Sequence, residues 1–324
     1  MSDGAVDGVV LVADELRPIC GDEPGWPGGR ATAFVAAGEP IPEDPRVEAL
    51  VPLLSRRIGA RELDRLPALR VVANYAVGYD NVDVEAASER GVAVANTPDV
   101  LTDATADLAW ALVLAAARRL REGLDLAVSG RWKGWHPTQL RGLALGGRTL
   151  GILGAGRIGS ATARRAPGFG MEVRYWSRSR NPELESEIGA ERVEDLDEII
   201  SSSHVLSLHL PLTEETEGIL GAERLARMPE GSVLVNTGRG GLLDHAALVE
   251  ALESGPLAAA GLDVYPEEPA IPEEVRAHPR CFVLPHLGSA TRRARAEMWE
   301  LAAENVRRVL TGRDPLTPVA PESA

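Results

Sequence analysis

Three polar segments in the C-terminal half follow apolar runs, and each carries a side chain suited to acid–base or anion chemistry. Arg239 is flanked by glycines, where a guanidinium can bind a carboxylate through two parallel hydrogen bonds. His286 lies between Pro285 and Gly288, a position for a general acid facing a cleft. A carboxylate of the acidic turn 263–269 would fix the tautomer of such a histidine and favour its protonated form. Singly, these segments are equally typical of a surface arginine, a structural histidine and a solvated turn.

A glycine-rich turn upstream makes the three segments more specific as a group. Gly154, Gly156 and Gly159 match G-x-G-x-x-G between an apolar strand at 150–153 and a helix expected from Ser160 to about Ala166. The first glycine permits a tight turn, the second lets the backbone approach a pyrophosphate, and the third lets the helix pack close to the strand. The helix N-terminus then offers N–H groups and a positive dipole to the phosphates. The pattern predicts dinucleotide binding.

The end of the next strand indicates which dinucleotide is bound. The expected strand at 173–176 is followed by Ser177, Arg178, Ser179 and Arg180, with no acidic residue at its tip. A carboxylate there holds the ribose 2′-hydroxyl of NAD, whereas an arginine suits the 2′-phosphate of NADP. We therefore expect NADP as the cofactor, with NAD as the alternative. A solvated basic loop is the other reading of these residues.

The remaining pattern alternates strands and helices, which is typical of parallel α/β layers. A stretch at 47–66 is predicted to be partly helical, a long helix is expected from Thr102 or Asp103 to about Glu122, and another from Ser289 or Thr291 to near Gly312. The tail from Asp314 carries three prolines and is predicted to be mobile. The predicted strands from residue 150 onward are 150–153, 173–176, 205–208, 233–236, 258–262 and 282–284.

Composition restricts the partners. The 324 residues carry a formal net charge of −14, which argues against nucleic acid and anionic membranes. We find no apolar run long enough to span a membrane, no secretory signal, and only Cys20 and Cys281, which have no metal-ligand spacing. These features predict a cytoplasmic protein without a metal site. If the ligands are anionic, arginines must be concentrated at the site.

Taken together, these motifs resemble the D-2-hydroxyacid dehydrogenase family, and within it the glyoxylate/hydroxypyruvate reductases. The resemblance extends from about Ala60 to Gly312 and includes the segments 74–83 and 97–103 as well as those described above. It implies that Arg239, Glu268 and His286 are the catalytic residues, with Glu268 directly before Pro269 at the family position. It also implies that backbone N–H groups of Val77 and Gly78, together with Arg239 and His286, bind the substrate. The implied coenzyme-binding residues are Gly154, Gly156, Arg157, Ile158, Gly159, Ser177, Arg178, Ser179, Arg180, Pro211, Thr237, Asp263 and Gly288.

The resemblance further implies a domain arrangement. A Rossmann-type doubly wound domain at 101–287 would be inserted into a flavodoxin-like α/β substrate domain made of 1–100 and 288–324. It also implies a cleft that can close and a homodimer built on the nucleotide domains. Trp132 and Trp135, in an expected loop at 129–147, suit an interface, a cover over a pocket, or packing onto the domain.

The implied activity is reduction of a small 2-oxo acid, glyoxylate or hydroxypyruvate, with hydride from a nicotinamide and a proton from His286. Other activities of the same family remain open, namely those on 3-phosphoglycerate, D-lactate or phosphite. A nucleotide-sensing protein without catalysis is an alternative from a different class.

Overall fold

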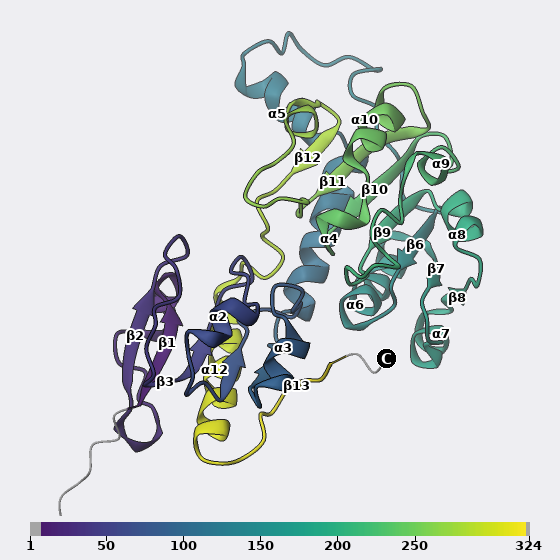
Figure 1. Cartoon of the computed structure of the whole chain (residues 1–324). Helices are drawn as coiled ribbons and strands as arrows, with labels where there is room; N and C mark the ends of the chain where they lie inside the picture. Colours follow the sequence, from purple (N-terminus) through teal and green to yellow (C-terminus); the bar gives the residue numbers. More distant parts are fainter. Residues whose placement is uncertain (1–7, 322–324) are drawn as a thin grey trace, which may run out of the picture. The chain divides into compact units, whose positions relative to one another are not determined.

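The computed structural model describes residues 8–321 and divides the chain into two compact units (Figure 1). The central unit is Thr102–Ser289, and the two-segment unit is Met1–Leu101 with Ala290–Ala324. These boundaries lie within two residues of the expected ones. No helix in the described part of the chain is long and apolar enough to cross a membrane.

The central unit contains a seven-stranded parallel sheet with the order β12-β11-β10-β9-β6-β7-β8. The chain runs outward from β6 to β8 and then returns to β9 on the other side of β6. That reversal is the topological switch point at which doubly wound sheets bind ligands beyond the carboxyl ends of the strands. The predicted Rossmann-type fold is confirmed. The strands are β6 (Thr149–Leu153), β7 (Glu172–Trp176), β8 (Glu191–Arg192), β9 (Val205–Leu208), β10 (Ser232–Asn236), β11 (Leu257–Leu262) and β12 (Cys281–Val283).

Alternating side chains of these strands enter two separate hydrophobic cores. Val233 and Val235 pack in one core with α4 (Thr102–Ala117) and α6 (Arg157–Arg165), whereas Leu234 packs in the other with α8 (Leu196–Ser202) and α10 (His245–Glu253). Because successive strand residues face opposite sides of a sheet, an apolar run buries both faces. The other helices of this unit are α5 (Leu120–Val128), α7 (Pro182–Ile188), α9 (Ala222–Leu225) and α11 (Glu273–Ala277).

Two helices of the central unit differ from their predicted bounds. The helix expected to reach Glu122 breaks near Arg119, which has a left-handed backbone with φ of 53°, and α5 then begins. The chain at 142–143 packs against the end of α4, where the N–H of Leu143 donates to the carbonyl of Ala117 at 2.8 Å. This tertiary contact was not visible in the local sequence. α6 begins at Arg157, three residues earlier than expected.

The two-segment unit contains a six-stranded sheet with the order β13-β5-β4-β3-β1-β2. The first five strands are parallel and follow the flavodoxin-like order, as predicted. Helices α2 (Ala60–Asp64) and α3 (Val84–Glu89) share one core with the sheet, and α12 (Arg292–Leu310) packs on β3, β4 and β5 outside that core. The strands are β1 (Val9–Ala13), β2 (Ala31–Val35), β3 (Val47–Val51), β4 (Val71–Ala73), β5 (Ala93–Ala95) and β13 (Pro318–Val319), and α1 (Arg17–Cys20) is a single turn.

The stretch 47–66 is helical in part, as predicted, because it contains α2, whereas its beginning forms strand β3 between β1 and β4. The prediction of a mobile tail was wrong. The tail from Asp314 is not free: β13 pairs antiparallel with β5. The buried carboxamide oxygen of Asn305 accepts N–H groups of Leu316 and Thr317 at 2.7 and 3.1 Å, and these bonds hold the tail.

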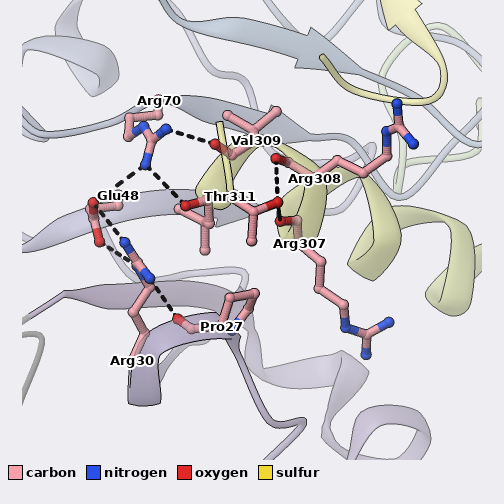
Figure 2. Close-up of polar contacts among 9 residues, drawn as sticks. Pro27, Arg30, Glu48, Arg70, Arg307, Arg308, Val309 and Thr311 are labelled. Carbon is pink, nitrogen blue, oxygen red and sulfur yellow. Dashed lines mark hydrogen bonds and ion pairs between the residues drawn. The ribbon is translucent and has the colours of Figure 1, made fainter. Parts of the chain in front are cut away.

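An ionic network connects the segment 21–29, which is rich in glycine and proline, with the end of α12 (Figure 2). Arg30 donates to the carbonyl of Pro27 and forms an ion pair with Glu48 on β3. Arg70 lies within 3.8 Å of the same carboxylate and donates to the carbonyl of Val309 at 2.6 Å. The last carbonyls of a helix lack internal partners, so Arg70 caps α12.

Candidate active site

The glycine-rich turn after β6 has a separate steric reason for each glycine. Gly154 has φ of 96°, and a Cβ there would lie 2.7 Å from the carbonyl oxygen of His209. A Cβ on Gly159 would lie 1.9 Å from the carbonyl oxygen of Gly154, so the helix packs directly on the turn. A Cβ on Gly156 would meet no atom within 4 Å. The third position is therefore fixed by the fold, whereas Gly156 leaves open space where a phosphate can approach.

The two arginines in the turn after β7, Arg178 and Arg180, differ in their contacts. The Arg180 guanidinium pairs with Glu185 at 2.6 Å, and the same carboxylate accepts the Tyr175 hydroxyl. The hydrogen bond from Arg180 holds the pKa of Glu185 below its ordinary value. Arg178 is exposed, and its side chain makes no ion pair or hydrogen bond within the described residues. Of the two arginines predicted to bind a phosphate, Arg178 is thus the one whose side chain is available.

The conformation of the segment that carries Arg239 is fixed by the Asn236 side chain and by a close approach of two loops. The buried Asn236 side chain donates to the carbonyl of Arg239 at 2.8 Å and accepts the N–H of Gly238 at 3.0 Å. A Cβ on Gly240 would lie 2.0 Å from the backbone of Tyr265, so the loops after β10 and β11 pass in contact. The close approach requires glycine at 240 and brings Arg239 beside the Asp263–Pro269 segment.

The loop after β12 is held by the carboxylate of Asp263. Its two oxygens accept the N–H groups of Leu287 and Gly288 at 2.7 and 2.8 Å, and its carbonyl accepts that of His286 at 3.0 Å. His286 itself has a left-handed backbone with φ of 54°, which these bonds enforce. Burial raises the pKa of Asp263 to about 6, against the opposing effect of the two N–H donors. Asp263 therefore holds this loop in place and orients the His286 side chain.

Glu268 and His286 form a direct pair. The His286 Nδ1 and a carboxylate oxygen of Glu268 lie 2.7 Å apart, and the other oxygen accepts the N–H of Tyr265 at 3.0 Å. Both side chains are 27% exposed, so water reaches the pair only in part. Burial alone would raise the pKa of Glu268, but the hydrogen bond and charge of His286, with a contribution from Arg239, hold it below its ordinary value. A carboxylate that stays ionised beside an imidazole favours the imidazolium.

The remaining coenzyme residues lie at one edge of the sheet. Pro211, Thr237, Asp263 and Gly288 follow β9, β10, β11 and β12, and the carboxyl ends of parallel strands meet at the same edge. The Thr237 hydroxyl is buried without a hydrogen-bond partner within the described residues, as expected of a group that awaits a ligand.

Val77 and Gly78 lie in the two-segment unit, in the loop after β4. Their carbonyls accept side-chain N–H groups from Asn96 at 2.7 Å and from Asn74 at 2.9 Å. Asn74 and Asn81 also bond reciprocally through their carboxamides, at 3.0 and 3.1 Å. We did not single out these three asparagines from the sequence. The available signal was a polar residue directly after each of two buried strands.

Comparisons with known proteins agree with this geometry. The model of the D-isomer specific 2-hydroxyacid dehydrogenase NAD binding domain matches residues 110–288. A glyoxylate reductase from Thermococcus kodakarensis is 51% identical over 280 residues, which cover 85% of this chain and 84% of the relative. The chain belongs to the D-isomer-specific 2-hydroxyacid dehydrogenase family.

Solved structures place it among the same dehydrogenases. A protein from Thermus thermophilus matches with a TM-score of 0.85 and 43% identity, covering 96% of this chain and 100% of the other. An NADPH-dependent glyoxylate/hydroxypyruvate reductase from Sinorhizobium meliloti, solved with NADP and malonate, has a TM-score of 0.87 and 34% identity, covering 97% of each chain. The predicted family, fold class and enzyme class of this dehydrogenase are confirmed, whereas the roles of its individual site residues stay predictions.

The dehydrogenase has residues that fit a nicotinamide coenzyme. Its matched domain is an NAD-binding one. The open space at Gly156 and the first turn of α6 suit a pyrophosphate, and the orphaned Thr237 hydroxyl lies at the same sheet edge. Within residues 8–321 no cluster of three His, Cys, Asp or Glu side chains is arranged to hold a metal ion.

Proposed function

We propose that this dehydrogenase reduces a short 2-oxo acid, glyoxylate or hydroxypyruvate, to the corresponding 2-hydroxy acid. The observation that carries the proposal is the 2.7 Å pair of Glu268 and His286 beside Arg239, at the edge of the nucleotide-binding sheet. The identity of 51% to a glyoxylate reductase supports the choice of substrate. A proton donor next to a cation is what a keto acid needs, because its carbonyl gains negative charge while its carboxylate must be held.

His286 is the proton donor in this proposal. Its Nδ1 faces Glu268, which leaves Nε2 to donate to the keto oxygen. The bound nicotinamide would supply the hydride to the keto carbon. Glu268 orients His286 through its Nδ1, and Asp263 fixes the loop from which His286 projects.

The carboxylate of the substrate is bound by Arg239 and by the N–H groups of Val77 and Gly78 in this proposal. A guanidinium binds a carboxylate in a planar fork and also polarises the adjacent carbonyl. Backbone N–H groups add hydrogen bonds without a second cation, which limits the desolvation cost.

A panel of acids tests the function. Oxidation of NADPH and of NADH is followed with glyoxylate, hydroxypyruvate, pyruvate and oxaloacetate, and the reverse reaction with 3-phosphoglycerate, D-lactate and phosphite. We expect the highest kcat/KM with glyoxylate or hydroxypyruvate. Turnover only with another member of the panel contradicts the proposed substrate. Tight coenzyme binding without any turnover favours a nucleotide sensor.

We also propose that the enzyme prefers NADPH and that Arg178 binds the 2′-phosphate. Arg178 is exposed without a partner within the described residues, whereas Arg180 is occupied by Glu185. Ser177 and Ser179 on the same turn supply hydroxyl donors of the kind a phosphate accepts.

Matched arginine variants test this preference. Arg178→Ala should raise the KM for NADPH about tenfold or more, the loss expected for a charge-assisted hydrogen bond, with little change for NADH. Arg180→Ala should raise it less, because that guanidinium already pairs with Glu185. Equal effects on NADPH and NADH would contradict a 2′-phosphate contact.

We propose a homodimer formed through the central unit, in the cytoplasm. Leu120, Leu124 and Val128 lie on one exposed face of α5, and the exposed Trp132 and Trp135 follow in the next loop. An apolar patch of this kind marks an interaction surface. Sedimentation should give a dimer for the wild type and a monomer for Leu124→Glu, whereas a monomeric wild type would contradict the proposal.

A further inference from the structure

The loop after β4 contains a glycine whose two flanking peptide planes are both fixed by asparagine side chains. The carbonyl of Val77 accepts Nδ2 of Asn96 at 2.7 Å, and the carbonyl of Gly78 accepts Nδ2 of Asn74 at 2.9 Å. Glycine lacks a Cβ and ranges widely in φ and ψ, so this loop would otherwise sample many orientations. We call Asn74, Asn81 and Asn96 the Gly78 clamp.

Fixing the carbonyls also fixes the N–H groups. In a trans peptide the N–H points opposite to the carbonyl, so each N–H here points away from the donor that holds its carbonyl. The carbonyl of Ala76 accepts the backbone N–H of Thr97 at 2.8 Å, which completes three held carbonyls in succession. The N–H groups of Val77, Gly78 and Tyr79 have no acceptor among the described residues of this unit. Backbone N–H groups without an internal acceptor are available to an anion.

The clamp is itself anchored. Asn74 is fully buried and bonds reciprocally with Asn81, whose Nδ2 also donates to the carbonyl of Arg56 at 3.0 Å in the loop after β3. A buried carboxamide without partners is costly, so a fully satisfied pair holds one orientation. The clamp is neutral and supplies orientation without adding a charge.

We propose that Asn74 and Asn96 are positioning residues that set the affinity for the substrate carboxylate, by holding the N–H groups of Tyr79 and Gly78 toward it, beside the N–H of Val77, which the Ala76–Thr97 backbone bond orients. This inference rests on the proposed function and extends it in two respects. It adds Tyr79 as a third N–H donor, and it assigns selectivity for a carboxylate over a neutral group to two asparagine side chains that do not touch the substrate.

The experiment compares Asn74→Ala and Asn96→Ala with Asn305→Ala. Asn305 is a matched control, because it is also a fully buried asparagine of this unit that bonds to the backbone. Its bonds are to N–H groups of the C-terminal tail and not to the loop after β4. Asn96 is only half-buried, so its variant is available if Asn74→Ala does not fold. Each protein is assayed with glyoxylate and with methyl glyoxylate, which lacks the negative charge, and the KM for NADPH is measured alongside.

We expect the KM for glyoxylate to rise about tenfold in both clamp variants, with kcat changed less and the KM for NADPH unchanged. The ratio of kcat/KM for glyoxylate to that for methyl glyoxylate should fall in the clamp variants and stay at the wild-type value in Asn305→Ala. Equal losses for the acid and the ester, or an unchanged KM for glyoxylate, would overturn the clamp while leaving the proposed function intact. A wild type that reduces no 2-oxo acid would overturn the proposed function, and with it the clamp.

Discussion

The ends of the strands in the two sheets carry different kinds of chemistry. In the central unit the loops after β10, β11 and β12 present titratable and charged side chains, Arg239, Glu268 and His286. In the two-segment unit the loop after β4 presents backbone N–H groups, and its asparagines are neutral. The first region can move a proton, whereas the second can only bind and orient.

This difference has a physical consequence for pH. Proton transfer requires groups whose charge changes near the working pH, and such groups respond to their neighbours. Amide donors do not titrate, so binding by the loop after β4 should be independent of pH in the neutral range. Variants of the central region should therefore change pH profiles, and variants of the clamp should change mainly KM, with the pH profile unchanged.

The largest effect is expected at His286. His286→Ala removes the proton donor and should lower kcat on the order of 10²–10⁴-fold, the range for loss of a general acid. Coenzyme affinity, measured by quenching of tryptophan fluorescence, should stay near the wild-type value. Retained turnover in this variant would show that the central region is not the proton source.

A smaller effect with a pH signature is expected at Glu268. The hydrogen bond and charge of His286 hold the pKa of this carboxyl below its ordinary value, so Glu268 is ionised in the neutral range. Glu268→Gln removes that charge, so kcat/KM should fall by about tenfold, equivalent to about 1.4 kcal/mol, and should lose the decline at acid pH that protonation of Glu268 causes in the wild type. The measurement is kcat/KM across the acid and neutral ranges of pH. An unchanged profile would contradict the role of the pair.

The smallest effect is expected at Asn81, the member of the clamp that bonds to Asn74 rather than to the carbonyls of Val77 and Gly78. Asn81→Ala should raise the KM for glyoxylate about two- to fivefold, because Asn74 loses its two hydrogen bonds to Asn81 but keeps its bond to Gly78. The pH profile should coincide with that of the wild type. A shifted profile would remove the distinction between the two regions.

Several features followed from sequence pattern alone. Strands β6, β7, β9, β10, β11 and β12 and the glycine turn were predicted, because apolar runs and glycine spacing are local signals, whereas the two-residue strand β8 was not. The family resemblance placed Arg239, Glu268 and His286 together, and the structure brings Glu268 and His286 to 2.7 Å.

Other features escaped sequence reasoning because they depend on contacts between distant segments. The break at Arg119 arises where residues 142–143 pack on α4, and β13 pairs with β5. Neither partner is near its target in the sequence, so propensity alone predicted a longer helix and a mobile tail.

The sequence by itself determined which residue types were available for chemistry and which segments were strands, since both depend on local composition and spacing. Only the tertiary structure decided which groups are free. It paired Arg180 with Glu185 and left Arg178 exposed, and it turned the carbonyls of Val77 and Gly78 toward two asparagines. Hydrogen-bond partners are set by proximity in three dimensions. The sequence pattern therefore does not show which of two similar donors, such as Arg178 and Arg180, has an acceptor beside it.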